Sequence, residues 1–194
     1  GKLLLTTDER SVVDGNKLGQ IDFQAPFESA GTDAILVGAS IHAEADATFA
    51  ADNNSTELVF STGASEAAAE KMRIASDGKV GIGTTAPETA LHVNGTGGGV
   101  VSAIMVEDSN ATSNQRRFRM YSSSQKAYFD IPNDAFDSAT DVMTVDLSNA
   151  YVGIGTTAPS SPLEVSKSSN SSEIRASAWS TTNAHSGTIA FVKS

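Results

Sequence analysis

The octapeptide VGIGTTAP occurs twice in this chain, at residues 80–87 and again at 152–159. The match continues beyond the octet, because an LxV pair follows at 91–93 and at 163–165. The shared pattern is VGIGTTAPxxxLxV, and agreement of this length at one fixed offset is not chance. An internal repeat of this kind is typical of an array of similar structural units rather than of one globular domain.

The similarity extends upstream and sets the limits of the units. Each octet follows an apolar-polar-apolar triplet, MRI at 72–74 and MTV at 143–145, with a short turn between. Alternating apolar residues on either side of a turn predict a strand, a turn and a second strand. We therefore predict a first unit at 1–93, a compact second unit at 94–166, and the truncated start of a third at 167–194.

Unit one is longer than unit two. If IDF at 21–23 matches FRM at 118–120, the stretch at 26–53 has no counterpart in unit two. Residues 41–49 within this stretch alternate apolar and polar side chains, which is the pattern of a half-buried strand. The sequence thus predicts an extra hairpin excursion at about 26–53. Helix is scarce, and we expect a loop or a single helical turn at 65–71.

The composition predicts an all-β chain that buries little within itself. Leu, Ile, Val and Phe account for 41 of the 194 residues, near the level below which chains do not fold alone. The absence of cysteine excludes a disulfide framework and a thiolate metal site. No run approaches the roughly 20 apolar residues of a membrane span. A formal net charge of −10 argues against nucleic acid and anionic membranes as partners.

The octet has the chemistry of a structural joint. In an extended chain its branched side chains share one face, while the glycines leave the other face bare. Bare glycines in a strand usually mark a bend or the close approach of another backbone, here expected from a neighbouring chain, and proline ends a strand ladder. The predicted joint residues are Val80, Gly81, Ile82, Gly83 and Pro87, with Val152, Gly153, Ile154, Gly155 and Pro159 in the second copy.

A phosphate-binding loop is the alternative interpretation of the octet. Both established phosphate motifs need more glycines, and a helix must follow them. A proline and a strand pattern follow here instead, so the sequence predicts no nucleotide or other cofactor.

Candidate catalytic residues are few. We interpret His42, His92 and His185 as solvated side chains, and His92 occupies a position where unit two has glutamate. Glu44 and Asp46 would lie about 7 Å apart on one strand face. This spacing suits the carboxylate pair of an inverting glycosidase, but it is also what any polar strand face gives.

The remaining polar clusters have structural interpretations. We expect Arg117 and Arg119 to share a strand face and to pair with carboxylates across strands or chains. Trp179 is predicted to serve packing, or simply to be exposed, rather than to stack on a sugar. The acidic and amide clusters at 52–54 and 130–134 lack the spaced ligands of a calcium loop, and such clusters favour turns. We therefore predict no metal site.

The segments GKVGIGTTAPETALHV at 78–93 and YVGIGTTAPSSPLEV at 151–165 resemble the repeats of bacteriophage tail fibres and related virion appendage proteins. Residues 18–93 resemble the shaft segments of marine phage tail fibres. The resemblance implies an elongated, fibrous, parallel and intertwined homotrimer of β-hairpins and short strands. It also implies a structural, non-enzymatic shaft in the virion tail or appendage, which spaces or supports attachment to the host receptor.

The implied partners are further copies of the chain, other virion tail proteins, and a host-surface polysaccharide or receptor. Assembly would take place in the cytoplasm of the bacterial host. Two alternatives stay open at this point. One is a bacterial surface filament or adhesin with the same repeat, and the other is a fragment of a polysaccharide-cleaving tailspike.

Overall fold

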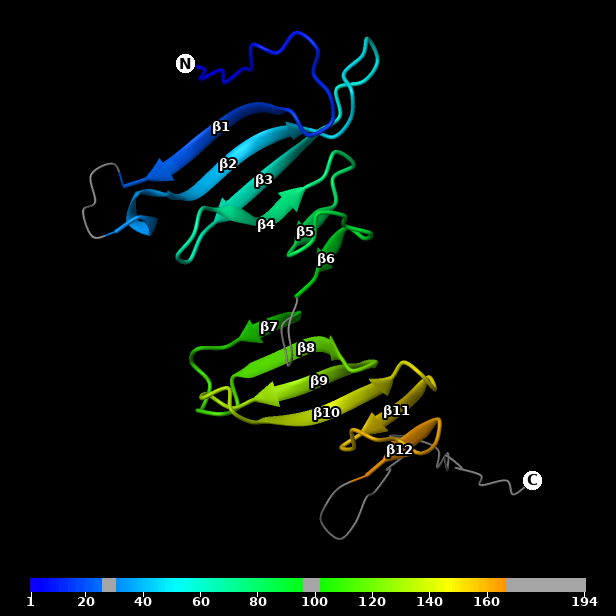
Figure 1. Ribbon diagram of the computed structural model, residues 1–194. Helices are drawn as coiled ribbons and strands as arrows, with labels where there is room; N and C mark the ends of the chain where they lie inside the picture. The colour runs from blue at the N-terminus through cyan, green and yellow to red at the C-terminus, as the bar shows by residue number, and fades with distance from the viewer. Residues whose placement is uncertain (26–30, 96–101, 167–194) are drawn as a thin grey trace, which may run out of the picture. The chain divides into compact units, whose positions relative to one another are not determined.

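The computed structural model describes residues 1–25, 31–95 and 102–166. The chain forms two compact units, Gly1–Ser102 and Ala103–Ser194. Each unit contains one six-stranded sheet (Figure 1). The fold class is all-β, as the sequence predicted.

The sheet of unit one follows the chain without crossovers, in the order β1-β2-β3-β4-β5-β6. Neighbouring strands are antiparallel up to β5, and the last pair, β5 and β6, is parallel. The strands are β1 (Lys17–Gln24), β2 (Val37–Ala45), β3 (Thr56–Thr62), β4 (Ala69–Ile74), β5 (Val80–Ile82) and β6 (Leu91–Val93).

Unit two repeats this topology strand for strand. Its order is β12-β11-β10-β9-β8-β7, and again only the last pair along the chain is parallel. The strands are β7 (Ala103–Glu107), β8 (Arg117–Ser123), β9 (Lys126–Pro132), β10 (Ala139–Asp146), β11 (Tyr151–Ile154) and β12 (Leu163–Val165).

The predicted extra hairpin at 26–53 is wrong. Strand β2 lies between β1 and β3 in the sheet, and its counterpart is β8. The sequence match of 21–23 with 118–120 paired β1 with β8, one strand out of step, because an apolar-polar-apolar triplet occurs in several strands, among them β1, β4, β8 and β10. The units differ in their connections instead: β2 and β3 are joined by 46–55, whereas β8 and β9 are joined by 124–125.

The unit boundary and one strand limit also need correction. The chain divides after Ser102 rather than after Val93. The strand predicted at 41–49 begins earlier and ends at Ala45. The loop expected near 65–71 is present at 63–68 and leads into β4, and the one helical element among the described residues is the 3-10 turn η1 (Asp33–Ile35). The predicted third unit at 167–194 lies outside the described residues.

One face of each sheet is apolar across all six strands. Side chains alternate between the two faces of a strand, so cross-strand partners form rows on one face. The central apolar row contains Ile21, Ile41, Phe60, Met72, Ile82 and Val93 in unit one, and Ile104, Met120, Phe129, Met143, Ile154 and Val165 in unit two.

Burial within one chain is the reverse of the usual pattern. None of these apolar side chains is buried, and the most exposed include Ile21 at 43 % and Ile104 at 44 %. The most buried side chains lie instead on the opposite, polar face of each sheet, where Asp130 and Thr144 have no exposed surface. Each unit therefore packs polar side chains against one another and leaves most of its apolar face uncovered. In unit one, Leu5 of the N-terminal segment lies against Gly19 on that face.

Candidate functional site: glycine joints and the two sheet faces

Each octet forms a joint where the chain leaves the last antiparallel strand. In unit one, β5 ends at Ile82 and Gly83 adopts a left-handed φ of 72°. The amide of Gly83 donates to the carbonyl of Lys71 over 2.9 Å. Lys71 is the unpaired residue of a β-bulge in β4, so its carbonyl is available. A Cβ on Gly83 would overlap the carbonyl oxygen of Asn94, so only glycine fits here.

The joint of unit two repeats these contacts. Gly155 also has a φ of 72°, and its amide donates to the carbonyl of Val142 over 3.1 Å. Val142 is the unpaired residue of the matching bulge in β10. A Cβ on Gly155 would overlap the carbonyl oxygen of Ser166. The sequence did not predict the bulge, because the side chains of Lys71 and Val142 are unlike. Each residue contributes only its backbone carbonyl to the joint.

The first glycine of each octet accommodates the chain as it folds back. Gly81 is buried, and a Cβ there would lie 2.5 Å from the carbonyl oxygen of Thr84. Gly153 and Thr156 show the same 2.5 Å distance. The threonine hydroxyl then accepts a hydrogen bond from a backbone amide two residues later, as expected for a corner. These contacts set the path of the turn.

The structure changes the predicted account of the joint in two ways. The backbones that approach these four glycines belong to the same chain, whereas the sequence argument assigned the approach to a neighbouring chain. The strand ends at the left-handed glycine and not at the proline. Pro87 lies within the connection 83–90, and Pro159 is buried beside Gly153 in the corresponding connection.

The residue at the centre of the final strand closes the joint in both units. His92 Nδ1 accepts from the amide of Glu88 over 3.4 Å. In unit two, Glu164 accepts from the amide of Ser160 over 2.8 Å, and this bond lowers the pKa of Glu164. Histidine and glutamate therefore both accept a hydrogen bond from a backbone N–H, so either residue can fill this position of the repeat.

The polar face of unit one centres on a buried carboxylate. Glu57 is 6 % exposed and pairs with Arg73, which also binds Glu70 over 2.7 Å. Glu44 lies directly opposite Glu57 on β2. Burial raises the pKa of Glu57, although its hydrogen bond to Arg73 acts in the opposite direction. The hydrogen bond to Glu70 and the pairing with Glu57 raise the pKa of Arg73.

The polar face of unit two centres on Asp130, which has no exposed surface. Arg119 binds it through two hydrogen bonds of 3.0 and 2.5 Å, which raise the pKa of the arginine. Asp141 lies directly opposite Asp130 on β10, and burial followed by repulsion from Asp130 raises its pKa. Tyr121 and Tyr128 stack beside them with ring centroids 4.8 Å apart. The face is a packed ion-pair and aromatic cluster.

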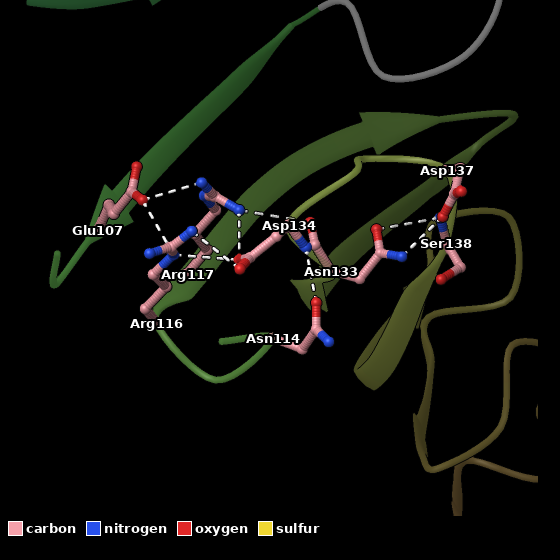
Figure 2. A network of polar contacts seen from close by, with 8 residues as sticks. All are labelled: Glu107, Asn114, Arg116, Arg117, Asn133, Asp134, Asp137 and Ser138. Carbon is pink, nitrogen blue, oxygen red and sulfur yellow. Dashed lines mark hydrogen bonds and ion pairs between the residues drawn. The ribbon is translucent and has the colours of Figure 1, made fainter. Parts of the chain in front are cut away.

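A second polar network ties two loops at the end of unit two (Figure 2). Arg117 binds Glu107 over 2.9 Å and Asp134 over 2.7 Å, and Arg116 binds Asp134 over 2.8 Å. The expected pairing of Arg117 and Arg119 with carboxylates across strands is confirmed. These ion pairs engage the carboxylates of Asp130 and Asp134, two of the residues considered as calcium ligands.

The other sequence candidates are dispersed. Glu44 lies on β2 within 3.4 Å of His42, whereas Asp46 follows the strand and accepts from Ser76. The interpretation of His42 as a solvated residue is wrong, since its side chain is packed on the polar face and is 8 % exposed. Trp179 and His185 lie outside the described residues.

Within residues 1–25, 31–95 and 102–166, no group of three or more histidine, aspartate or glutamate side chains is placed to hold a metal ion. No helix in the same residues has the length and apolar character to cross a membrane.

Comparison with known proteins gives a likeness to several solved chains, two of which come from a bacteriophage tail fibre. No family model matches the chain, and no curated protein matches it. The first structure is the carboxy-terminal domain of the bacteriophage T5 L-shaped tail fibre, with 11 % identity, a TM-score of 0.36, and coverage of 78 % of this chain and 86 % of that one. The second contains the same domain with its intramolecular chaperone, with 11 % identity, a TM-score of 0.37, and coverage of 95 % and 67 %.

Proposed function

We propose that this chain is a non-enzymatic shaft segment of a bacteriophage tail fibre, built as a homotrimer. Its place would be the virion tail or an appendage, after assembly in the cytoplasm of the bacterial host. Its partners would be two further copies, other virion tail proteins, and a host-surface polysaccharide or receptor that the fibre helps to reach.

The observation that carries the proposal is the exposed apolar face of each sheet. Five strand spacings of about 4.8 Å make this face about 24 Å wide, broader than the scattered apolar residues of an ordinary monomer surface. Ile82 and Ile154 remain 41 % and 42 % exposed at matching positions in the two units. Burial of such a face against identical faces would provide the apolar core that one chain lacks.

The opposite face supports the same arrangement. Its charges are paired within each unit, as Arg73 is with Glu57 and Arg119 with Asp130. A face whose buried carboxylates Glu57 and Asp130 already have partners is suited to remain outside. The repeat of one joint and one apolar face in successive units is the design expected of a shaft that lengthens by adding units.

Sedimentation velocity or mass photometry tests the proposal directly. We expect a particle of three chains, each of 20.0 kDa. Ile82→Glu and Ile154→Glu should reduce the trimer, because each would bury a charge between apolar faces. Gln20→Glu adds the same charge on the opposite face of unit one and should leave the trimer intact.

A stable, folded monomer of the unmodified chain would contradict the proposal. It would mean that the apolar faces are covered within one chain. Since the chain has no cysteine, Ile82→Cys offers a second measurement. Oxidation should link copies of this variant if the apolar faces meet, and equal cross-linking of Gln20→Cys would show that the contact is not specific to that face.

A further inference from the structure

Two tyrosine rings stack face to face on the polar face of unit two. Tyr121 of β8 and Tyr128 of β9 lie directly opposite each other in the register of the two strands. Their ring centroids are 4.8 Å apart and their planes differ by 14°. Stacking of this kind stabilises a sheet, but two phenylalanine rings would stack as well. The two phenol groups therefore give the pair a chemistry that packing does not need.

The turn between β8 and β9 fixes this pairing. Ser124 and Gln125 alone connect the two strands, and both have left-handed φ values, 50° and 62°. A two-residue turn of this form is the tight hairpin turn, which sets the register of its strands. Arg119 restrains the pair further, since its guanidinium lies over the ring of Tyr121 at 4.9 Å. The folded chain thus holds the two rings in contact.

The tyrosine pair is accessible and is specific to unit two. Both side chains are half-buried, and they lie on the face that the proposed trimer leaves outside. His42 and Val59 occupy the matching positions in unit one, so that unit has no equivalent pair. The third tyrosine of the chain, Tyr151, lies on β11 opposite Asp146. It provides a comparison for any reaction of the stacked pair.

Stacked phenols are placed for oxidative coupling. Removal of one electron and one proton from each phenol gives two phenoxyl radicals, whose unpaired electrons are shared with the ring carbons beside the C–O carbon. A C–C bond between two such carbons forms through p orbitals perpendicular to the rings, and stacking turns these orbitals toward each other. Rings held in contact by the fold react far more readily than rings that must first meet.

The coupling balances with hydrogen peroxide as the oxidant. After the C–C bond forms, the hydrogen on each coupled carbon moves to the oxygen of the same ring, which restores both phenols. The pair has then lost two electrons and two protons, and one molecule of peroxide takes them up as two molecules of water. Burial raises the pKa of Tyr121, so this phenol is neutral at pH 7 and gives up its proton together with its electron.

We infer that Tyr121 and Tyr128 are a site of covalent dityrosine formation, which links β8 to β9 when a peroxide and a one-electron catalyst such as a haem peroxidase act on the folded protein. The link is a crosslink that a chain without cysteine cannot obtain from a disulfide. It should stabilise unit two, because a crosslink restricts the unfolded chain. The inference goes beyond the proposed shaft and does not depend on the number of chains in the particle.

Oxidation of the full chain with hydrogen peroxide and a haem peroxidase tests the inference. Tryptic cleavage after Lys126 puts the two tyrosines on separate peptides, so mass spectrometry should find these peptides joined with the loss of two hydrogen atoms. The oxidised chain should keep the size of one chain on a denaturing gel. Tyr151→Phe should form the link as the wild type does. Tyr128→Phe keeps the stacked ring and should lose the link.

The consequence for stability is measured on the same samples. Oxidation should raise the unfolding temperature of the wild type but not that of Tyr128→Phe, which controls for oxidation of other side chains. Absence of the 121–128 link, links that join different chains, or equal coupling to Tyr151 would overturn the inference. A link without a gain in unfolding temperature would show that it does not brace the hairpin. The mass of the native particle, measured separately, decides the shaft proposal.

Discussion

The polar faces of the two units contain the same three kinds of charged residue, arranged in opposite order across the strands. In each, a buried carboxylate on the third strand lies between an arginine on one neighbouring strand and a second carboxylate on the other. The order along the chain is Glu44, Glu57 and Arg73 on β2, β3 and β4 of unit one, and Arg119, Asp130 and Asp141 on β8, β9 and β10 of unit two.

This reversal contrasts with the joints, which agree contact by contact. A strand has a neighbour on each side, so either neighbour can supply the arginine that a buried carboxylate needs. A left-handed glycine beneath a carbonyl oxygen has no equivalent substitute. The two copies of the repeat therefore have identical residues where one backbone segment packs against another. They differ where side chains can exchange roles.

The largest expected effect comes from Gly83→Ala and Gly155→Ala. Each places a Cβ against a carbonyl oxygen and forces alanine into the left-handed region. We expect a loss of more than about 3 kcal/mol in the affected unit, since the left-handed conformation alone costs about 1–2 kcal/mol. Hydrogen exchange read by mass spectrometry should show lost protection in one unit at a time.

Gly38→Ala is the control for these variants. A Cβ at position 38 would lie 3.8 Å from the carbonyl oxygen of Phe23, an ordinary contact. Protection that survives Gly83→Ala as well as it survives Gly38→Ala would contradict the close approach at the joint.

A smaller effect is expected from Arg73→Met and Arg119→Met. Each leaves a buried carboxylate without its cation, which should cost about 2–4 kcal/mol. The loss should be at least as large for Arg119, because Asp130 is fully buried whereas Glu57 is 6 % exposed. Thermal unfolding at pH 7 and pH 4 provides the measurement, and acid should reduce the loss by protonating the orphaned carboxyl.

Lys79→Met removes the cation of the exposed Lys79–Asp77 ion pair and serves as the control. Exposed pairs contribute little, so its unfolding temperature should change little. Equal losses in this variant and in Arg119→Met would mean that burial does not set the strength of these pairs.

The turn between the fourth and fifth strands offers a test of about 1 kcal/mol. Unit one has Gly78 there with a φ of 84°, and unit two has Ala150 with a φ of 58°. Ala150→Gly should stabilise unit two by about 1 kcal/mol, and Gly78→Ala should destabilise unit one by a similar amount. A Cβ at position 78 would meet nothing within 4 Å, so the effect is one of backbone conformation alone. Denaturant midpoints that shift in the same direction for both variants would contradict this.

The sequence predicted the β class and the position of the joints because both follow from local patterns. Alternation marks strands, and a glycine pair followed by LxV marks the crossing to the last strand. The sequence could not predict which strands of the two units correspond. The triplet IDF at 21–23 lies in β1, yet its pattern matches FRM at 118–120, which lies in β8. The sequence also missed the bulges at Lys71 and Val142, which present only their backbone to the joint.

The polar faces were missed for a different reason. Asp130 and Asp141 are separated by a loop in sequence, and only the register of β9 and β10 places them opposite each other. Composition and spacing carry no signal for this arrangement.

The smallest expected effect concerns the like-charged pairs. The pKa of Asp141 and that of Glu57 are both raised in the folded protein. A raised carboxyl pKa means that the folded state holds its proton more tightly than the unfolded state. Stability should therefore fall as the pH rises through a window above the ordinary carboxyl pKa of about 4. Asp141→Asn should remove this slope in unit two and stabilise it by about 0.5 kcal/mol at pH 7.

Asp146→Asn separates this effect from a general response to acid. Its hydrogen bond to Ser148 lowers the pKa of Asp146, so the contribution of that carboxylate is present above its unfolded pKa and is lost as the pH falls. Thermal unfolding from pH 2 to pH 8 should show Asp141→Asn gaining on the wild type as the pH rises above about 4, and Asp146→Asn losing as the pH rises toward about 4. Since Asp141 and Asp146 lie on the same strand, opposite slopes would show that the contacts of each carboxylate, and not the strand, set the pH dependence. If both variants shift in the same direction, the pairing of Asp130 with Asp141 does not control the pH response of unit two.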